Sequence, residues 1–215
     1  MKDKQIRVLV LLSMLAAVAY ALVCLIRIPV VGFLSYEPKD VIITISGFLL
    51  GPMSSFVISL TVSLLAMVTI SSTGPIGGLM NLISSCSFAC TAAFIYKYRR
   101  DTVGGIVGLI AGSCAMVAVM LLWNWLITPL YMGVSREAVE GMLIPMFLPF
   151  NALKAGLNSG FTLLLYKPLV TALRKTRLID SRSTSAGGKK IGLYLFAAGL
   201  LITCVLLLLV FQGRI

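Results

Sequence analysis

The chain of 215 residues has no histidine and only seven acidic residues. Histidine is the commonest proton relay in active sites and a frequent metal ligand, so its absence removes the usual basis for both. The sequence also contains no G-x-x-x-x-G-K-[ST] phosphate loop, since the run Gly187–Lys190 lacks that spacing. We therefore expect no catalytic residues, no metal site and no cofactor, and the sequence disfavours an enzyme.

Cysteines give no sign of a disulfide framework, because all five lie inside apolar runs. Cys86 and Cys90 are spaced four residues apart. Without histidine to complete a metal site, the pair is interpreted as small packing residues.

Charge is scarce as well, at 12% of residues, whereas hydrophobic residues make up 59% and the mean hydropathy is +1.04. This composition is typical of an integral membrane protein. The basic start and Ala17–Ala19 resemble a signal peptide, but the apolar run continues past them, which favours a first membrane helix. Seven apolar segments follow one another: Arg7–Ile28, Asp40–Leu50, Met53–Ile70, Leu79–Tyr98, Gly104–Tyr131, Pro145–Pro168 and Ile191–Phe211.

These segments predict an all-α polytopic membrane protein. Residues 1–175 would form a six-helix domain, residues 176–190 a basic Ser/Gly linker and residues 191–215 an appended transmembrane helix. The segment Asp40–Leu50 is too short to cross a bilayer upright without its neighbours. Between it and the next segment, Gly51-Pro52 predicts a tight break, because proline can open a helix but not continue one.

Lysines and arginines predict the orientation. With a cytoplasmic N-terminus and every segment crossing, thirteen of them fall inside and four outside, which fits the positive-inside rule. The net charge of +11 is then a sign of topology and contact with anionic lipid, not of nucleic-acid binding. The protein is expected in the cell membrane, with residues 37–40 on the outer side.

Polar side chains interrupt the segment Pro145–Pro168. Asn151, Lys154 and Asn158 fall within about 60° of one another on a helix, and Thr162 continues the stripe. An ammonium at membrane depth costs roughly 2.5–3.5 kcal/mol, so it normally faces a cavity or a partner. The alternative is that Lys154 snorkels to the interface while Asn151 caps the helix. Two amides on the same face favour the cavity.

Other polar groups fall at the same outer level. Asn124 stands between Trp123 and Trp125, and Asn81 and Ser84 open an earlier helix. Amides, an ammonium and aromatic rings are suited to a flat, polar heteroaromatic ligand. Interfacial tryptophan belts and structural hydrogen bonds remain the alternative, which we favour for Asn81.

Small residues recur every fourth position in two places. Ser13, Ala17 and Ala21 form one such ridge, and Gly104, Gly108 and Gly112 form another. Such ridges allow helices to approach closely in lipid, either inside the bundle or against an external partner. We see no two matching halves with broken helices, which argues against an inverted-repeat secondary transporter. The sequence suggests a substrate-binding subunit that depends on a separate motor, with a stand-alone carrier or a structural membrane protein as rivals.

Three motifs carry a resemblance to a known family: Phe33–Pro52 (FLSYEPKDVIITISGFLLGP), Trp123–Gly133 (WNWLITPLYMG) and Leu148–Leu169 (LPFNALKAGLNSGFTLLLYKPL). Over Arg7–Lys175 the chain resembles the riboflavin-specific S components of energy-coupling factor (ECF) transporters. That family implies a six-helix protein that binds riboflavin from outside. Its partners would be a transmembrane coupling subunit and two cytosolic ATPase subunits, which topple the S component in the membrane. The final span departs from the six-helix pattern.

The resemblance also implies residue roles. Asn124, Asn151 and Lys154 match positions that bond the flavin ring, the loop around Tyr36–Asp40 would cover the pocket, and Ala17-x-x-x-Ala21 would meet the coupling subunit. An S component for another vitamin, such as folate or pantothenate, remains open. The expected substrate-binding residues are Asn124, Asn151, Lys154, Tyr36, Glu37, Asp40, Asn81 and Trp123.

Overall fold

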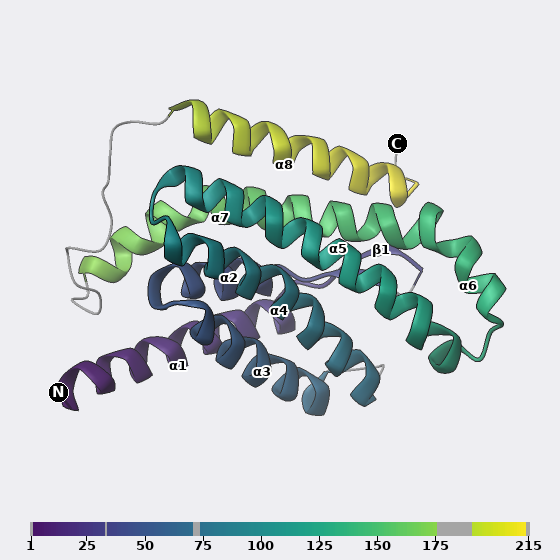
Figure 1. Ribbon diagram of the computed structural model, residues 1–215, viewed down its shortest axis with the longest axis horizontal. Helices are drawn as coiled ribbons and strands as arrows, with labels where there is room; N and C mark the ends of the chain where they lie inside the picture. Colours follow the sequence, from purple (N-terminus) through teal and green to yellow (C-terminus); the bar gives the residue numbers. More distant parts are fainter. Residues whose placement is uncertain (1, 33, 71–73, 176–190, 214–215) are drawn as a thin grey trace.

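The computed structural model describes residues 2–32, 34–70, 74–175 and 191–213, and these are almost entirely helical (Figure 1). The helices are α1 (Lys2–Leu25), α2 (Lys39–Leu50), α3 (Pro52–Thr69), α4 (Gly74–Tyr98), α5 (Thr102–Met132), α6 (Arg136–Met142), the π-helical turn η1 (Leu143–Phe147), α7 (Leu148–Lys175) and α8 (Ile191–Phe211). Within this described part, five helices are long and apolar enough to cross a membrane: α1, α3, α4, α5 and α8. The predicted helical membrane fold is confirmed. The predicted linker, 176–190, lies outside the described residues.

Two stretches between the predicted apolar segments contain regular structure. In the first, β1 (Ile28–Val31) and β2 (Leu34–Tyr36) form an antiparallel hairpin, in which Ile28 pairs with Tyr36. Gly32 has φ 54° after β1, a left-handed conformation that glycine adopts without strain. In the second, α6 begins after Ser135, whose hydroxyl accepts a hydrogen bond from the Ala138 amide. Short apolar strands and helix caps of this kind give only weak sequence signals, so neither the hairpin nor α6 was predicted.

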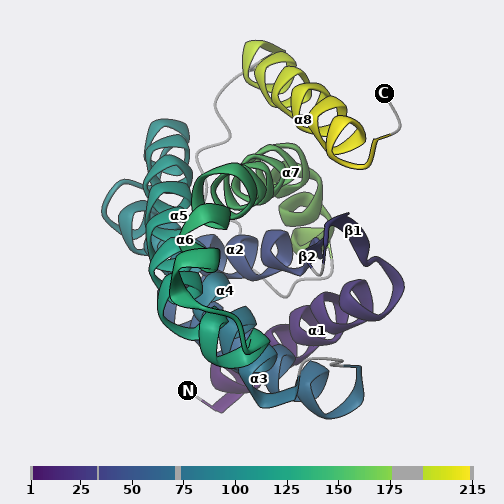
Figure 2. The ribbon, with the colours of Figure 1, turned by 90° about the vertical axis from the view of Figure 1, so that its right-hand side faces the viewer.

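The short helix α2 occupies the middle of the bundle. It contacts α1, α3, α4 and α7, and Figure 2 shows it between α7 on one side and α1 on the other. The residues from Lys39 to Gly47 are all buried, so the helix starts inside the protein. Its 12 residues span only about 18 Å. The hairpin carries the chain into the bundle before α2 begins, which explains how so short a segment fits.

The predicted break between the second and third segments is confirmed. Gly51 has φ 103°, and Pro52 occupies the first turn of α3. The glycine ridge of α5 faces α4: a Cβ at Gly108 would lie 2.6 Å from the Ala92 carbonyl oxygen, and one at Gly112 would lie 2.5 Å from that of Phe88. This ridge therefore serves close packing inside the bundle.

The α1 ridge behaves differently. Ser13, Ala17 and Ala21 are exposed, while the opposite stripe of α1 is buried in the main core and consists of Leu11, Leu15, Ala19 and Val23. No described part of this chain covers the ridge to the point of burial. A contact of the ridge with lipid or with another protein is thus sterically open.

Candidate functional site

The polar stripe of α7 points into the protein. Asn151, Lys154, Asn158 and Thr162 are all buried, and the Lys154 side chain is only 7% exposed. Lys154 therefore does not snorkel to the interface, and that alternative is wrong. Asn151 does not cap α7 either, because its Nδ2 donates to the Phe147 carbonyl one turn earlier, at 2.8 Å.

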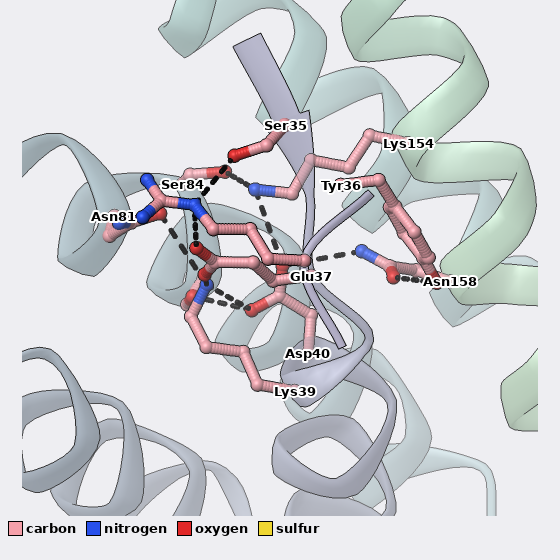
Figure 3. Close-up of polar contacts among 11 residues, drawn as sticks. Ser35, Tyr36, Glu37, Lys39, Asp40, Asn81, Ser84, Lys154 and Asn158 are labelled. Carbon is pink, nitrogen blue, oxygen red and sulfur yellow. Dashed lines mark hydrogen bonds and ion pairs between the residues drawn. The ribbon is translucent and has the colours of Figure 1, made fainter. Parts of the chain in front are cut away.

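The partner of Lys154 is Asp40, at the start of α2. The Lys154 Nζ lies 3.5 Å from Asp40 Oδ2 and also donates to the Ser84 hydroxyl on α4, at 3.0 Å (Figure 3). The Asp40 carboxylate is fully buried and accepts further hydrogen bonds from the Ser85 hydroxyl and from Asn158 Nδ2. Such a buried carboxylate is tolerable only when it is paired and hydrogen-bonded, and here it is both.

A second ion pair lies beside the first. Lys39 Nζ lies 2.9 Å from Glu37 Oε2 and 3.9 Å from Asp40 Oδ1, and it donates to Asn81 Oδ1 at 3.4 Å (Figure 3). Arg27 lies at the edge, with its Nε 3.6 Å from Glu37 Oε1. Burial opposes ionisation of Glu37, but Lys39, together with Lys154 and Arg27, outweighs it and lowers the pKa of this carboxyl. The carboxylate therefore remains charged.

The hairpin is joined to α7 by a buried hydrogen bond. The Tyr36 hydroxyl at the end of β2 donates to Asn158 Oδ1, at 3.1 Å. Asn158 also hydrogen-bonds Asp40, because its Nδ2 donates to the Asp40 carboxylate. Residues from the hairpin, α2, α4 and α7 thus form one network, which we call the Asp40 network: Tyr36, Glu37, Lys39, Asp40, Asn81, Ser84, Ser85, Lys154 and Asn158.

Five of the predicted binding residues belong to this network, namely Tyr36, Glu37, Asp40, Asn81 and Lys154. Within the described part of the chain, no hydrogen bond or ion pair joins the other three, Asn124, Asn151 and Trp123, to it. Asn124 is buried, and its amide is satisfied within α5: Nδ2 donates to the Met120 carbonyl at 2.7 Å, and Oδ1 accepts from Thr128 at 3.0 Å.

Asn124 and Asn151 nevertheless lie at a similar depth. Helices α5 and α7 run in opposite directions (Figure 1), and the hydroxyls of Ser113 and Ser159 meet at 3.2 Å. With a rise of about 1.5 Å per residue, Asn124 is about 16 Å along α5 from that contact, and Asn151 is about 12 Å along α7 from it. Both lie beyond Lys154, on the side of the hairpin. The Asn151 Oδ1 is buried and has no hydrogen-bond partner among the described residues.

The two tryptophans have different surroundings. Trp123 is partly buried and packs against the main core. Trp125 is engaged with α6: its Nε1 donates to Glu140 Oε1 at 2.9 Å, and the Arg136 guanidinium lies 5.1 Å from its ring centroid. The Trp125 side chain is therefore engaged with α6 rather than with Asn124 or Asn151 in the hydrogen bonds of the described residues.

Sequence reasoning omitted four residues of the Asp40 network from the expected site: Lys39, Ser84, Ser85 and Asn158. Lys39 was considered only as part of the outer loop around Tyr36–Asp40, although it is 1% exposed. The sequence did offer one signal for Lys39. It stands next to Asp40, and acidic residues are rare in this chain, which has only seven. Asn158 was visible on the polar stripe. Ser85 had no signal of its own, because serines are frequent in membrane helices.

Comparisons with known proteins agree on one family. The model for "ECF transporter, substrate-specific component" matches residues 7–166. The riboflavin transporter RibU of Staphylococcus aureus (strain TCH60) is 29% identical over 176 residues, which cover 78% of this chain and 92% of that protein. The riboflavin transporter FmnP of Bacillus subtilis (strain 168) is 28% identical over 162 residues, covering 70% and 85%.

A solved structure, described as "Structure and mechanism of the S component of a bacterial ECF transporter", has a TM-score of 0.67 and 30% identity to this chain. The match covers 79% of this chain and 99% of the chain in that structure. The family is one of transporter components and not of enzymes. The chain therefore belongs to the substrate-specific components of ECF transporters, and it is the multi-pass, substrate-binding membrane subunit of such a transporter.

Proposed function

We propose that the protein captures riboflavin from the outer side of the cell membrane. The observation that carries this proposal is the pair of relatives, both named riboflavin transporters, which match 78% and 70% of the chain. Neither of these relatives is named for folate or pantothenate, the rival substrates. The structure adds a buried polar network and two further buried amides near the end of the bundle where the hairpin lies.

The chemistry of riboflavin suits these groups. Its ring has one imide N–H and two carbonyl oxygens, and its ribityl chain has hydroxyls. Asn151 Oδ1 is a buried acceptor that requires a donor, which an N–H or O–H of the vitamin would supply. Lys154 has three N–H donors, of which Ser84 and Asp40 engage two, so one remains for a carbonyl oxygen. Trp123 would provide apolar surface for the ring.

Import would require partners. The chain has no phosphate loop, so we propose that a transmembrane coupling subunit and two cytosolic ATPase subunits supply the energy. The exposed Ala17 and Ala21 are the proposed docking ridge for the coupling subunit. The positive-inside bias supports a cytoplasmic N-terminus, so that the hairpin faces outward. The chain would need no cofactor of its own, and lipid would cover its exposed apolar faces.

Riboflavin should bind to the detergent-purified chain without nucleotide or metal, and its fluorescence should be quenched. The Asn151→Leu variant should bind about tenfold more weakly, because losing one buried hydrogen bond to the ligand costs about 1–3 kcal/mol. The matched control is Leu165→Ala, at a half-exposed position of the same helix. Fluorescence titration with riboflavin, beside calorimetry with folate and pantothenate, measures these affinities. Tight binding of another vitamin without riboflavin binding would contradict the proposal.

A further inference from the structure

Helix α8 lies outside the part of the chain that the family model matches, which ends at residue 166. One stripe of α8 is buried, and it consists of Ala197, Leu201, Cys204 and Leu208, spaced by four, three and four residues. The opposite faces of α8 expose large apolar side chains such as Leu195 and Ile202. The helix therefore has a specific inner side and a lipid-facing outer side.

The inner side of α8 packs on the substrate-site helix, α7. A Cβ at Gly156 would lie 2.7 Å from the Cys204 Sγ, and one at Gly160 would lie 2.8 Å from the Leu201 side chain. Gly156-x-x-x-Gly160 is thus a close-contact groove that accepts two residues of α8. These glycines flank Asn158, which belongs to the Asp40 network. Helix α8 therefore packs directly behind the helix that carries Lys154 and Asn158.

The same helix also contacts the hairpin. Gln212, just after α8, donates its Nε2 to the Pro29 carbonyl of β1, at 2.6 Å. Leu201, Cys204 and Leu208 share an apolar core with the hairpin residues Val30, Leu34 and Tyr36. Tyr36 is the hairpin residue that bonds Asn158. Through these contacts, α8 and Gln212 bridge α7 and the hairpin.

We propose that α8 is a positioning element, which holds the hairpin against α7 and thereby slows the release of the bound substrate. Gln212 is its positioning residue, because it reaches the hairpin backbone directly. The part of this inference that concerns riboflavin rests on the proposed function, whereas the docking of α8 does not. Figure 2 shows α8 on the side of the molecule opposite α1. The exposed α1 ridge therefore remains accessible while α8 is docked.

A disulfide tests the docking. In the Gly156→Cys variant of the full chain, the new thiol should lie against the native Cys204 and oxidise to a disulfide. With a protease site introduced into the linker 176–190, the α8 fragment should remain attached after cleavage on a non-reducing gel and separate on reduction. The matched control is Gly199→Cys, at a position where no other described part of the chain comes within 4 Å of the Cβ. Equal release of the fragment from both variants would overturn the inference.

The positioning role is tested with Gln212→Ala and with Val210→Ala, a half-exposed control on the same helix. Loss of one hydrogen bond should speed amide hydrogen exchange in the hairpin, and riboflavin release, by about two- to tenfold in Gln212→Ala only. Riboflavin binding with unchanged exchange and release would overturn the inference and leave the proposed function intact. Faster exchange in a protein that binds no riboflavin would support the positioning of the hairpin while removing the proposed function.

Discussion

Replacing Lys154 with methionine is expected to lower the free energy of unfolding by about 3–5 kcal/mol, the typical cost of removing one partner of a buried ion pair. Asp40 is fully buried, and the substitution would leave its charge with Lys39 at 3.9 Å as the remaining cation. If Lys154 only bonded the ligand, Lys154→Met would weaken binding at least about tenfold in a protein that still folds. The ion pair to Asp40 is the reason to expect a loss of stability as well.

The compensated variant Lys154→Met/Asp40→Asn separates stability from binding. It removes one charge of each sign, so most of the lost stability should return, whereas riboflavin binding should stay weak because the ammonium is absent. Thermal unfolding in detergent and fluorescence titration on the same preparations measure the two properties. A Lys154→Met protein with parental unfolding temperature would show that the pair contributes nothing to the fold.

The double variant Ala17→Trp/Ala21→Trp should no longer co-purify with the coupling subunit and the ATPase subunits. Riboflavin uptake should therefore be lost as well. Riboflavin binding should remain within about twofold of the parent, because both alanines are exposed and the added bulk does not enter the core. The matched control is Val107→Trp/Ile110→Trp, at exposed positions of α5.

Pull-down with the motor subunits, uptake into vesicles and flavin titration on one preparation distinguish the outcomes of the Ala17/Ala21 test. A double variant that still assembles and transports would exclude the ridge from coupling. Uptake by the parent chain without any ATPase subunit would instead support a stand-alone carrier.

The helices were largely predictable, because long apolar runs and their breaks are local features of a sequence. Ile191–Phe211 has the same bounds in the structure as in the sequence analysis, and Gly51-Pro52 separates α2 from α3 as expected. The inward direction of Asn151, Lys154 and Asn158 also followed from helix periodicity and from the cost of a lipid-exposed ammonium.

The connections between distant residues were not predictable from periodicity. Asp40 and Lys154 are far apart in the chain, and neither position specifies the other until the fold brings α2 against α7. The direction of Trp125 depends on α6, a short helix whose apolar content is too low to be recognised as a segment. The docking of α8 depends on two glycines of α7 that resemble any small residues in a membrane helix.

The small molecule that co-purifies with the chain tests the central claim most directly. The full chain would be produced in cells supplied with riboflavin, folate and pantothenate, washed in detergent and then denatured to release its ligand. The absorbance spectrum before denaturation and mass spectrometry afterwards would identify that ligand and its amount. We expect a yellow protein that releases close to one riboflavin per chain. A folded chain that releases folate or pantothenate instead, or that binds no riboflavin under these conditions, would contradict the account.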